Sequence, residues 1–270
     1  LLGGVAAWVA VRGKLRGLMA QAMGTPHPDG PVKGAAGYRP KWGMAIDLDK
    51  CTACQGCVVA CRMENNVPTA GPEQTEKDRG IFWMDLLRVD EGRHPDLKTQ
   101  FIPIPCNHCE NAPCVKVCPV GATHITKEGI VAQIWARCIG CRFCTTAGPY
   151  TRRYFNWPAP SWPEASRNTL NPYVATRPKG VVEKCTFCRQ RIRQARETAR
   201  AEGRALTDQD VQKLPACAQA CPADAIRFGD LNDPDSEVSR LGRSPRAHRL
   251  QEELGTRPKV IYLRETKWRE

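Results

Sequence analysis

Fifteen cysteines gathered in four short groups are the feature that most constrains this chain of 270 residues. Group one is CTACQGCVVAC from position 51, and group two is CNHCENAPCVKVCP from position 106. Group three is CIGCRFC from position 138, and group four is split between CTFC at 185 and CAQAC at 217. In such spacings a Cys-x-x-Cys turn and a third nearby thiolate wrap one iron–sulfur cube, while a last cysteine points to a second cluster. The pattern therefore indicates bound iron–sulfur clusters.

Other uses of cysteine fit this spacing less well. A zinc ribbon pairs two Cys-x-x-Cys knuckles around one ion and needs no third cysteine at the same interval. The odd number of cysteines and the packing of four thiols into eleven residues of group one disfavour disulfides. Free redox pairs would not occur in groups of four.

The ligand count predicts how the groups pair. If each group gives three ligands to one cluster and its last cysteine to a neighbour, groups two and three pair, and groups one and four remain. The prediction is four ligand sets: set I, Cys51, Cys54, Cys57 and Cys221; set II, Cys61, Cys185, Cys188 and Cys217; set III, Cys106, Cys109 and Cys114; set IV, Cys118, Cys138, Cys141 and Cys144. Sets I, II and IV are expected to hold one [4Fe-4S] cluster each.

Set III is one thiolate short, because the expected fourth position, 148, is a glycine followed by Pro149. The simplest consequence is a [3Fe-4S] cluster, which we expect to have the highest reduction potential of the four, since it has fewer thiolates. Two alternatives stay open. His108 could supply a substitute ligand or, more simply, an N–H donor to sulfur, and position 148 could be a sequence error.

The charge and hydropathy of the chain bear on its partners. A formal charge of +12 would suit a nucleic acid. However, fifteen thiolates and four iron cores contribute about −8, which leaves a holoprotein near +4. Most of the basic excess therefore offsets cofactor charge, and the rest suits an acidic partner or anionic headgroups, so no nucleic acid is expected. The mean hydropathy of −0.46 excludes a polytopic membrane protein.

The predicted fold is α+β, with two interleaved bacterial-ferredoxin-like units, insertions, short strands and few helices. Residues 41–100 plus 180–230 would form the first unit (groups one and four), 101–179 the second (groups two and three), and 231–270 a C-terminal tail. Residues 1–40 begin with LLGGVAAWVAV, which is shorter than the roughly 20 residues of a spanning helix. We expect a signal-like or anchor segment there, or a short buried helix, followed by a linker. Strands are expected within 81–90, 124–138, 223–231 and 257–265, and a helix over 189–204.

Over residues 42–265 the chain resembles the four-cluster subunits of the complex iron–sulfur molybdoenzymes, through CNHCENAPCVKVCPVGAT, ARCIGCRFC, GVVEKCTFCRQRI and ACAQACPADAIRFGD. ENNVP, YFNWPAP, LNPYVATRPKG and LQEELGTRPKVIYL are most similar to the iron–sulfur component of alternative complex III and of the quinone reductase complex of sulfate reducers. In those complexes the deficient position is typically the second cysteine of group three. This chain keeps that cysteine, Cys141, and lacks the ligand at 148.

The resemblance implies an electron-transfer subunit that is not itself an enzyme. It would relay single electrons between an integral membrane quinone-binding subunit of polysulfide-reductase type and a molybdopterin-type or multihaem cytochrome subunit. The half with groups two and three would lie nearer the membrane, on the periplasmic face, held there by partners or by the N-terminal segment. The alternatives are an iron–sulfur subunit of a sulfur-compound, nitrite or other molybdoenzyme-type reductase, a cluster that is itself the catalyst, and a zinc or nucleic-acid-binding module.

Overall fold

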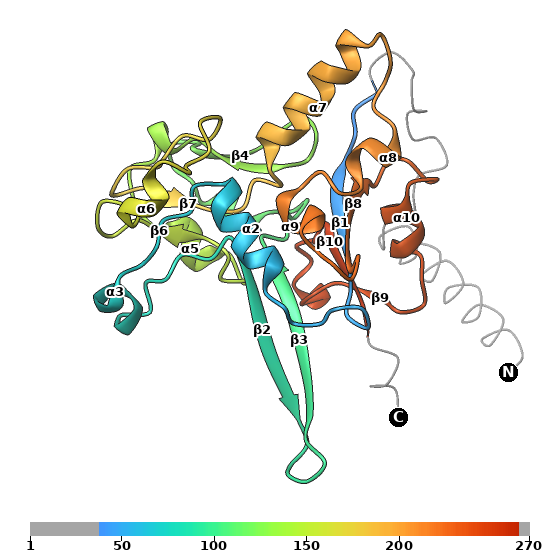
Figure 1. Ribbon diagram of the computed structural model, residues 1–270, viewed down its shortest axis with the longest axis horizontal. Helices are drawn as coiled ribbons and strands as arrows, with labels where there is room; N and C mark the ends of the chain where they lie inside the picture. Colours follow the sequence, from blue (N-terminus) through green and yellow to red (C-terminus); the bar gives the residue numbers. More distant parts are fainter. Residues whose placement is uncertain (1–37, 265–270) are drawn as a thin grey trace, which may run out of the picture. The chain divides into compact units, whose positions relative to one another are not determined.

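A four-stranded sheet joins the beginning and the end of the part of the chain that the computed structural model describes, residues 38–264 (Figure 1). The strand order is β8-β1-β10-β9. β1 (Trp42–Asp47) pairs in parallel with β10 (Val260–Leu263) and antiparallel with β8 (Ile226–Asp230), while β9 (Ala247–His248) pairs antiparallel with β10. The residues that follow β8, predicted as a tail ending in a strand, thus contribute two strands to this sheet. The predicted signal-like segment lies outside the described residues, apart from its last three.

The two inner strands are almost wholly buried, as expected for strands with a neighbour on each side. All four residues of β10 and the first five of β1 are buried. Trp42 stacks on Phe228 across the sheet, with ring centroids 5.4 Å apart. A Cβ on Gly43 would lie 2.4 Å from Leu231 Cδ1 and 3.0 Å from Lys259 O, so any other residue here would have to displace the Leu231 side chain. The strands predicted within 223–231 and 257–265 are confirmed.

The other strands of residues 38–264 form three antiparallel pairs. β2 (Met84–Glu91) and β3 (Lys98–Pro105) form a hairpin that projects beyond the other described elements (Figure 1). β4 (Thr123–Ile125) pairs with β5 (Val131–Gln133), as predicted within 124–138. β6 (Tyr154–Phe155) pairs with β7 (Val182–Glu183).

The helices are short, apart from the predicted one, α7 (Arg189–Ala201). The others are α2 (Gly56–Glu64), α3 (Pro72–Glu76), α4 (Pro113–Lys116), α5 (Phe143–Ala147), α6 (Glu164–Arg167), α8 (Asp208–Val211), α9 (Ala216–Gln219) and α10 (Glu237–Gly242), with 3-10 turns at Trp135–Arg137 and Glu252–Leu254. Within residues 38–264, none of these helices has both the length and the apolar character needed to cross a membrane. The predicted α+β class with short strands is confirmed.

The four cysteine groups share backbone features in pairs. In groups one and three, the residue after the second cysteine is left-handed and starts a helix: Gln55 (φ 59°) precedes α2, and Arg142 (φ 63°) precedes α5. The residue before the second cysteine is left-handed in all four groups: Ala53 (φ 57°), His108 (φ 44°), Gly140 (φ 71°) and Phe187 (φ 53°). Helix packing repeats as well, since α2 packs against α9 and α5 against α4.

The buried apolar residues form two clusters, and each cluster contains cysteines of two of the four groups. The larger cluster contains the sheet together with buried cysteines of groups one and four. The smaller one contains buried cysteines of groups two and three, with Val131 and Val182. Groups one and four therefore share one core, and groups two and three share the other.

Candidate metal centres

Set I lies where the loop of group one meets the end of α9. Cys57 is in the first turn of α2, and Cys221 follows α9, against which α2 packs. Burial, and then the nearby thiols of Cys51, Cys221 and Cys54, raise the pKa of Cys57 to about 12. The structure thus brings together the four cysteines of set I.

Set II is the most enclosed of the four sets, because all of its cysteines are buried. Burial, and then the thiols of Cys185, Cys188 and Cys217, raise the pKa of Cys61 well above its usual value. The buried amide of Asn65 lies 3.7 Å from Cys61 Sγ and donates to Cys188 Sγ at 3.5 Å. These four cysteines come from separate segments, α2, the loop before α7, and α9, and the thiols of the other three lie near enough to Cys61 to influence its pKa.

Set III brings its three cysteines together. Burial, and then the thiol of Cys106, raise the pKa of Cys109 to about 11. Burial also raises the pKa of Cys114, against the lowering effect of the Arg153 guanidinium, which donates from Nη1 to Cys114 Sγ at 3.4 Å. Gly148 has φ −85° and ψ 108°, a conformation open to any residue. The backbone at this position therefore does not require glycine in place of cysteine.

Set IV spans two packed elements: three of its cysteines come from the loop that enters α5 and from α5 itself, and Cys118 follows α4. Burial alone raises the pKa of Cys118, but backbone N–H groups of Thr123, Val120 and Ala122 outweigh it and lower the pKa. Thr123 N donates to Cys118 Sγ at 3.4 Å, and Ala225 N donates in the same manner to Cys221 Sγ at 3.3 Å. The turn at Cys118 therefore favours a thiolate.

Thiols of neighbouring sets also lie close to one another. Burial raises the pKa of Cys217 well above its usual value, and Cys57 of set I is among the thiols that raise it further. Burial likewise raises the pKa of Cys185 to about 12, with Cys106 of set III among the contributors. Set II therefore lies between sets I and III.

The same relationship extends from set III to set IV, because the thiol of Cys144 is one of the groups that, after burial, raise the pKa of Cys114. The four sets thus lie in the order I, II, III, IV. Exposure follows this order: Cys54 of set I and Cys141 of set IV are exposed, whereas set II in the interior is buried. The two ends of the series reach the surface.

Three cations are buried around set III: Arg153, Lys184 and Lys259, at 8%, 1% and 2% exposure. Burial, and then these three charges, hold the pKa of His108 well below its usual value, so the imidazole is neutral. Burial lowers the pKa of Lys259 to about 8. No ion pair to a carboxylate joins any of the three among the described residues. An anionic group at set III would balance this buried positive charge.

Unpaired donors complete the chemistry of the site. His108 Nδ1 accepts a hydrogen bond from Val131 N at 3.1 Å, so the ring proton is on Nε2. In the described part of the chain this Nε2–H has no partner, and neither has the side-chain amide of buried Asn107. Cluster sulfurs accept such hydrogen bonds. Converging thiols, buried cations and unpaired donors therefore fit bound iron–sulfur clusters.

Sequence reasoning missed four of these residues: Asn65, Arg153, Lys184 and Lys259. Two of them had a visible signal, since Lys184 directly precedes Cys185 and Asn65 follows Cys61 by one helical turn. Arg153 and Lys259 lie far along the chain from the cysteines that they influence, and the local pattern gives no sign of them.

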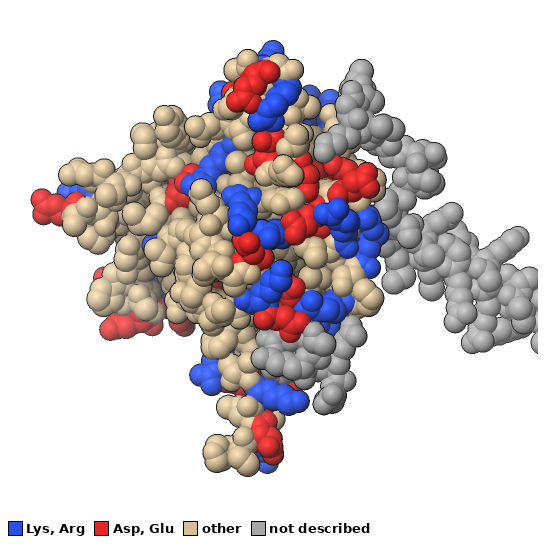
Figure 2. Space-filling model, turned by 45° about the vertical axis from the view of Figure 1, so that its right-hand side comes forward, with Lys and Arg blue, Asp and Glu red and all other residues tan. Residues whose placement is uncertain are grey.

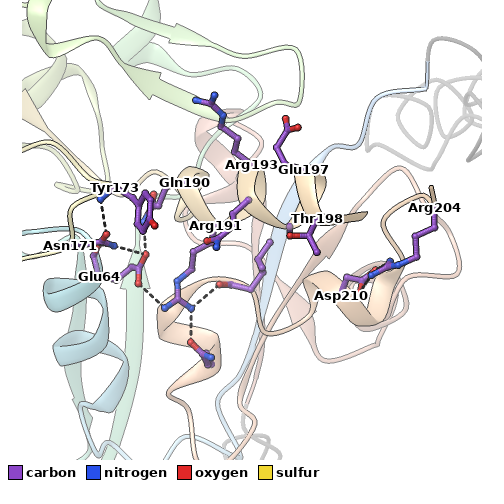
Figure 3. A pocket seen from close by; sticks show the side chains of 14 residues that line it. Glu64, Asn171, Tyr173, Gln190, Arg191, Arg193, Glu197, Thr198, Arg204 and Asp210 are labelled. Carbon is purple, nitrogen blue, oxygen red and sulfur yellow. Dashed lines mark hydrogen bonds and ion pairs between the residues drawn. The ribbon is translucent and has the colours of Figure 1, made fainter. Parts of the chain in front are cut away.

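An open cleft of about 970 Å³ lies beside α7, and none of its lining residues is a cysteine (Figure 3). In it, Arg191 Nη2 donates to Glu64 Oε2 at 2.7 Å, and Arg191 Nη1 donates to Gln219 Oε1 at 2.5 Å. Gln190 Nε2 donates to Glu64 Oε1 at 2.9 Å. These hydrogen bonds tie together α2, α7 and α9, which carry or adjoin the cysteines of sets I and II.

Charged side chains of both signs intermingle over the described residues on the face shown in Figure 2. α7 lies at the top of this view and carries part of the mixture, with Arg196 paired to Glu128 at 2.5 Å. The basic excess of the chain thus does not gather into one broad patch on this face.

Comparison with known proteins gives a consistent result. The family model of a 4Fe-4S dicluster domain matches residues 97–164, which contain groups two and three. The chain is 48% identical over 236 residues to the iron-sulfur cluster-binding subunit of menaquinone reductase from Nitratidesulfovibrio vulgaris, covering 86% of this chain and 91% of that protein. It is 38% identical over 250 residues to the iron-sulfur subunit of arsenate respiratory reductase from Shewanella sp., covering 82% and 95%. It is 40% identical over 236 residues to a dimethyl sulfoxide reductase iron-sulfur subunit from Halobacterium salinarum, covering 82% and 78%.

Proposed function

The chain belongs to the family of iron–sulfur subunits of menaquinone, dimethyl sulfoxide, arsenate and selenate reductase complexes, and we propose that it conducts electrons along the series of sets I, II, III and IV. It is an electron-transfer subunit of an oxidoreductase complex and not a catalytic one. Iron–sulfur clusters supply reversible one-electron redox chemistry. The observation that carries the proposal is that thiols of neighbouring sets influence one another, Cys57 with Cys217, Cys106 with Cys185 and Cys114 with Cys144, while Cys54 and Cys141 at the two ends are exposed.

We assign three [4Fe-4S] clusters to sets I, II and IV, and one [3Fe-4S] cluster to set III. In this assignment His108 is an N–H donor to sulfur and not a ligand, because its Nδ1 is engaged by Val131 N and its Nε2–H lacks a partner among the described residues. The pairwise repetition of left-handed residues and helix packing supports two interleaved ferredoxin-like units. Residues 41–100 plus 180–230 would form one unit and 101–179 the other, with 231–270 as the C-terminal segment.

Exposed apolar side chains flank the cysteines of set IV along the chain and support a docking role for this end. We call them the set IV rim; they are Val117, Val120, Ile125, Ile139 and Phe143. Ile139 and Phe143 are each 64% exposed and lie within two residues of set IV cysteines. Exposed apolar groups around a redox site favour an apolar partner surface. We propose that this end faces an integral membrane quinone-binding subunit of polysulfide-reductase type.

The set I end would then face the larger redox subunit, of molybdopterin or multihaem cytochrome type. The complex would lie on the outer face of the cytoplasmic membrane, where the chain is held by its partners or by its N-terminal segment. No nucleic acid is proposed as a partner at either end of the series.

The test is to purify the complex anaerobically through a tag on this chain, to identify the co-purifying subunits, and to add a quinol. The proposal expects a polytopic membrane subunit, a larger redox subunit, and reduction of the clusters that is abolished by a quinone-site inhibitor. Purification of a complex without a membrane subunit would contradict it and would favour the alternative, an iron–sulfur subunit of a sulfur-compound, nitrite or other molybdoenzyme-type reductase.

A further inference from the structure

The place of the missing ligand in set III lies beside a buried arginine. A Cβ built on Gly148 would lie 3.9 Å from Arg153 Cδ, and its nearest neighbour would be the carbonyl oxygen of Cys144, at 3.3 Å. The chain between them, which includes Pro149, turns back so that Arg153 points toward set III. The position that lacks a negative thiolate is thus next to a positive guanidinium.

The guanidinium of Arg153 is held in a fixed orientation. Nη2 donates to Thr123 Oγ1 at 2.7 Å and to Gln133 Oε1 at 2.6 Å, and Nη1 donates to Cys114 Sγ at 3.4 Å. Its Nε has no hydrogen-bond partner among the described residues. Thr123 also donates its backbone N–H to Cys118 of set IV. Arg153 therefore contacts a set III sulfur directly and a set IV sulfur through one intermediate residue.

The positive charge of Arg153 is neither well screened by water nor neutralised by a carboxylate, so it acts on set III. The residue is only 8% exposed, so water screens it weakly. Its two oxygen acceptors, Thr123 and Gln133, are neutral, and no carboxylate pairs with it in the described part of the chain. The nearest negative group is the Cys114 thiolate that a cluster would require.

We infer that Arg153 is a positioning residue that raises the reduction potential of set III, because it places a buried positive charge, with no carboxylate partner among the described residues, next to position 148, where the ligand count puts the missing fourth thiolate. The inference rests on the proposed cluster at set III. When one electron enters this site, its negative charge increases by one. A fixed cation nearby stabilises this reduced form more than the oxidised form, and therefore raises the potential.

The test uses the full chain in its complex, purified anaerobically, and a mediated redox titration followed by EPR at set III. The variants are Arg153→Gln, which removes the charge, and Arg153→Lys, which keeps it. Arg152→Gln is the matched control: the neighbouring arginine is partly buried, but it donates to Asp85 Oδ2 and Tyr150 O, not to a cysteine.

Arg153→Gln is expected to shift the ratio of oxidised to reduced set III at least tenfold toward the oxidised form, about 59 mV for one electron. Arg153→Lys should recover at least half of this shift, and Arg152→Gln should leave the potential unchanged. A wild-type potential in Arg153→Gln, or an equal shift in Arg152→Gln, would overturn the inference. So would loss of the cluster from both Arg153 variants, which would show a purely structural role.

Failure of the cofactor assignment would be seen separately, in the unmodified protein. A four-iron spectrum at set III in the wild type would refute the three-iron assignment, and the titration of the Arg153 variants would then follow that four-iron signal instead. Gly148→Cys supplies a reference for this spectrum, because the backbone conformation at 148 is open to any residue and a Cβ there requires only a small shift away from Cys144 O, at 3.3 Å.

Discussion

The imidazole of His108 stacks on the ring of Phe187, with centroids 3.7 Å apart and planes inclined by 23°. Each ring occupies the third position of its Cys-x-x-Cys loop, His108 in group two and Phe187 in group four. Both are left-handed and almost fully buried. The stack therefore joins set II to set III at equivalent positions, and Phe187 extends the contact edge-on to Phe228 of the central sheet, at 5.3 Å.

Substitution of Phe187 by leucine should weaken the junction between the two halves. Loss of the stacking contact removes about 0.5–1.5 kcal/mol beyond the change in buried area. We expect the visible absorbance of the clusters to decay several-fold faster on mild heating. Phe82→Leu, at a 39% exposed ring, is the control and should decay at the wild-type rate. Equal decay of the two variants would show that the stack does not support the junction.

Substitution of Asn65 by alanine should lower the reduction potential of set II. The amide N–H groups beside Cys61 and Cys188 stabilise a more negative sulfur, so their removal disfavours the reduced state. A redox titration followed by EPR measures the change. Asn66→Ala is the matched control, because Asn66 donates to the carbonyls of Asn171 and Val174 and to no thiol. The explanation would be wrong if the control shifted the potential as much.

Substitution of Glu64 by glutamine should accelerate loss of the clusters from sets I and II. The change weakens charge-assisted hydrogen bonds, worth about 1.5–3 kcal/mol when buried and less at this partly exposed site. Glu197→Gln, in the same cleft, is the control. The rate of absorbance loss at neutral pH is the measurement, and equal rates for the two variants would contradict this role.

The stabilisation that Glu64 and Arg191 provide has a defined pH dependence. Burial alone raises the pKa of Glu64, but hydrogen bonds from Arg191 and Gln190 outweigh it, so the pKa in the folded protein is lowered. A lowered pKa means that the stabilisation is fully present above the unfolded value of about 4.3 and is lost as the pH falls through the folded value. The ratio of the Glu64→Gln and wild-type rates should therefore be constant from about pH 6 to 8. A ratio that approached one within this range would count against the assignment.

Charge on the set IV rim should prevent docking to the membrane partner. The double substitution Ile139→Glu and Phe143→Glu places two carboxylates on exposed apolar positions beside set IV. We expect the chain to move from the membrane fraction to the soluble fraction while its cluster content is unchanged. Val59→Glu, 60% exposed near set I, should leave the membrane association intact. Release by Val59→Glu alone would place the membrane partner at the opposite end.

The sequence predicted those parts of the site that depend on local spacing. Within each group a few residues fix the turn, so the grouping of Cys51, Cys54 and Cys57 on one loop could be expected from the chain itself, whereas α2 was not predicted. The pairing of groups one and four followed from ligand counting, and the structure brings Cys61 together with Cys185, Cys188 and Cys217. The strands within 81–91, 123–133, 226–230 and 260–263 were also predictable, whereas β1 and β3 were not predicted.

The parts of the fold and of the site that the sequence did not predict depend on contacts between distant segments. Arg153 is 39 positions from Cys114, and Asn65 is 123 positions from Cys188. The parallel pairing of β1 with β10 joins the two ends of the described chain, and no local pattern specifies such a partner. Polar residues that act on sulfur are recognisable only when burial and distance are known, because in sequence they look like ordinary surface residues.

The most direct test of the whole account is an iron and acid-labile sulfide analysis of the anaerobically purified protein, together with its oxidised EPR spectrum. Three four-iron clusters and one three-iron cluster correspond to about 15 iron and about 16 sulfide per chain, with an EPR signal from the oxidised three-iron centre. Four zinc ions without acid-labile sulfide would contradict the account.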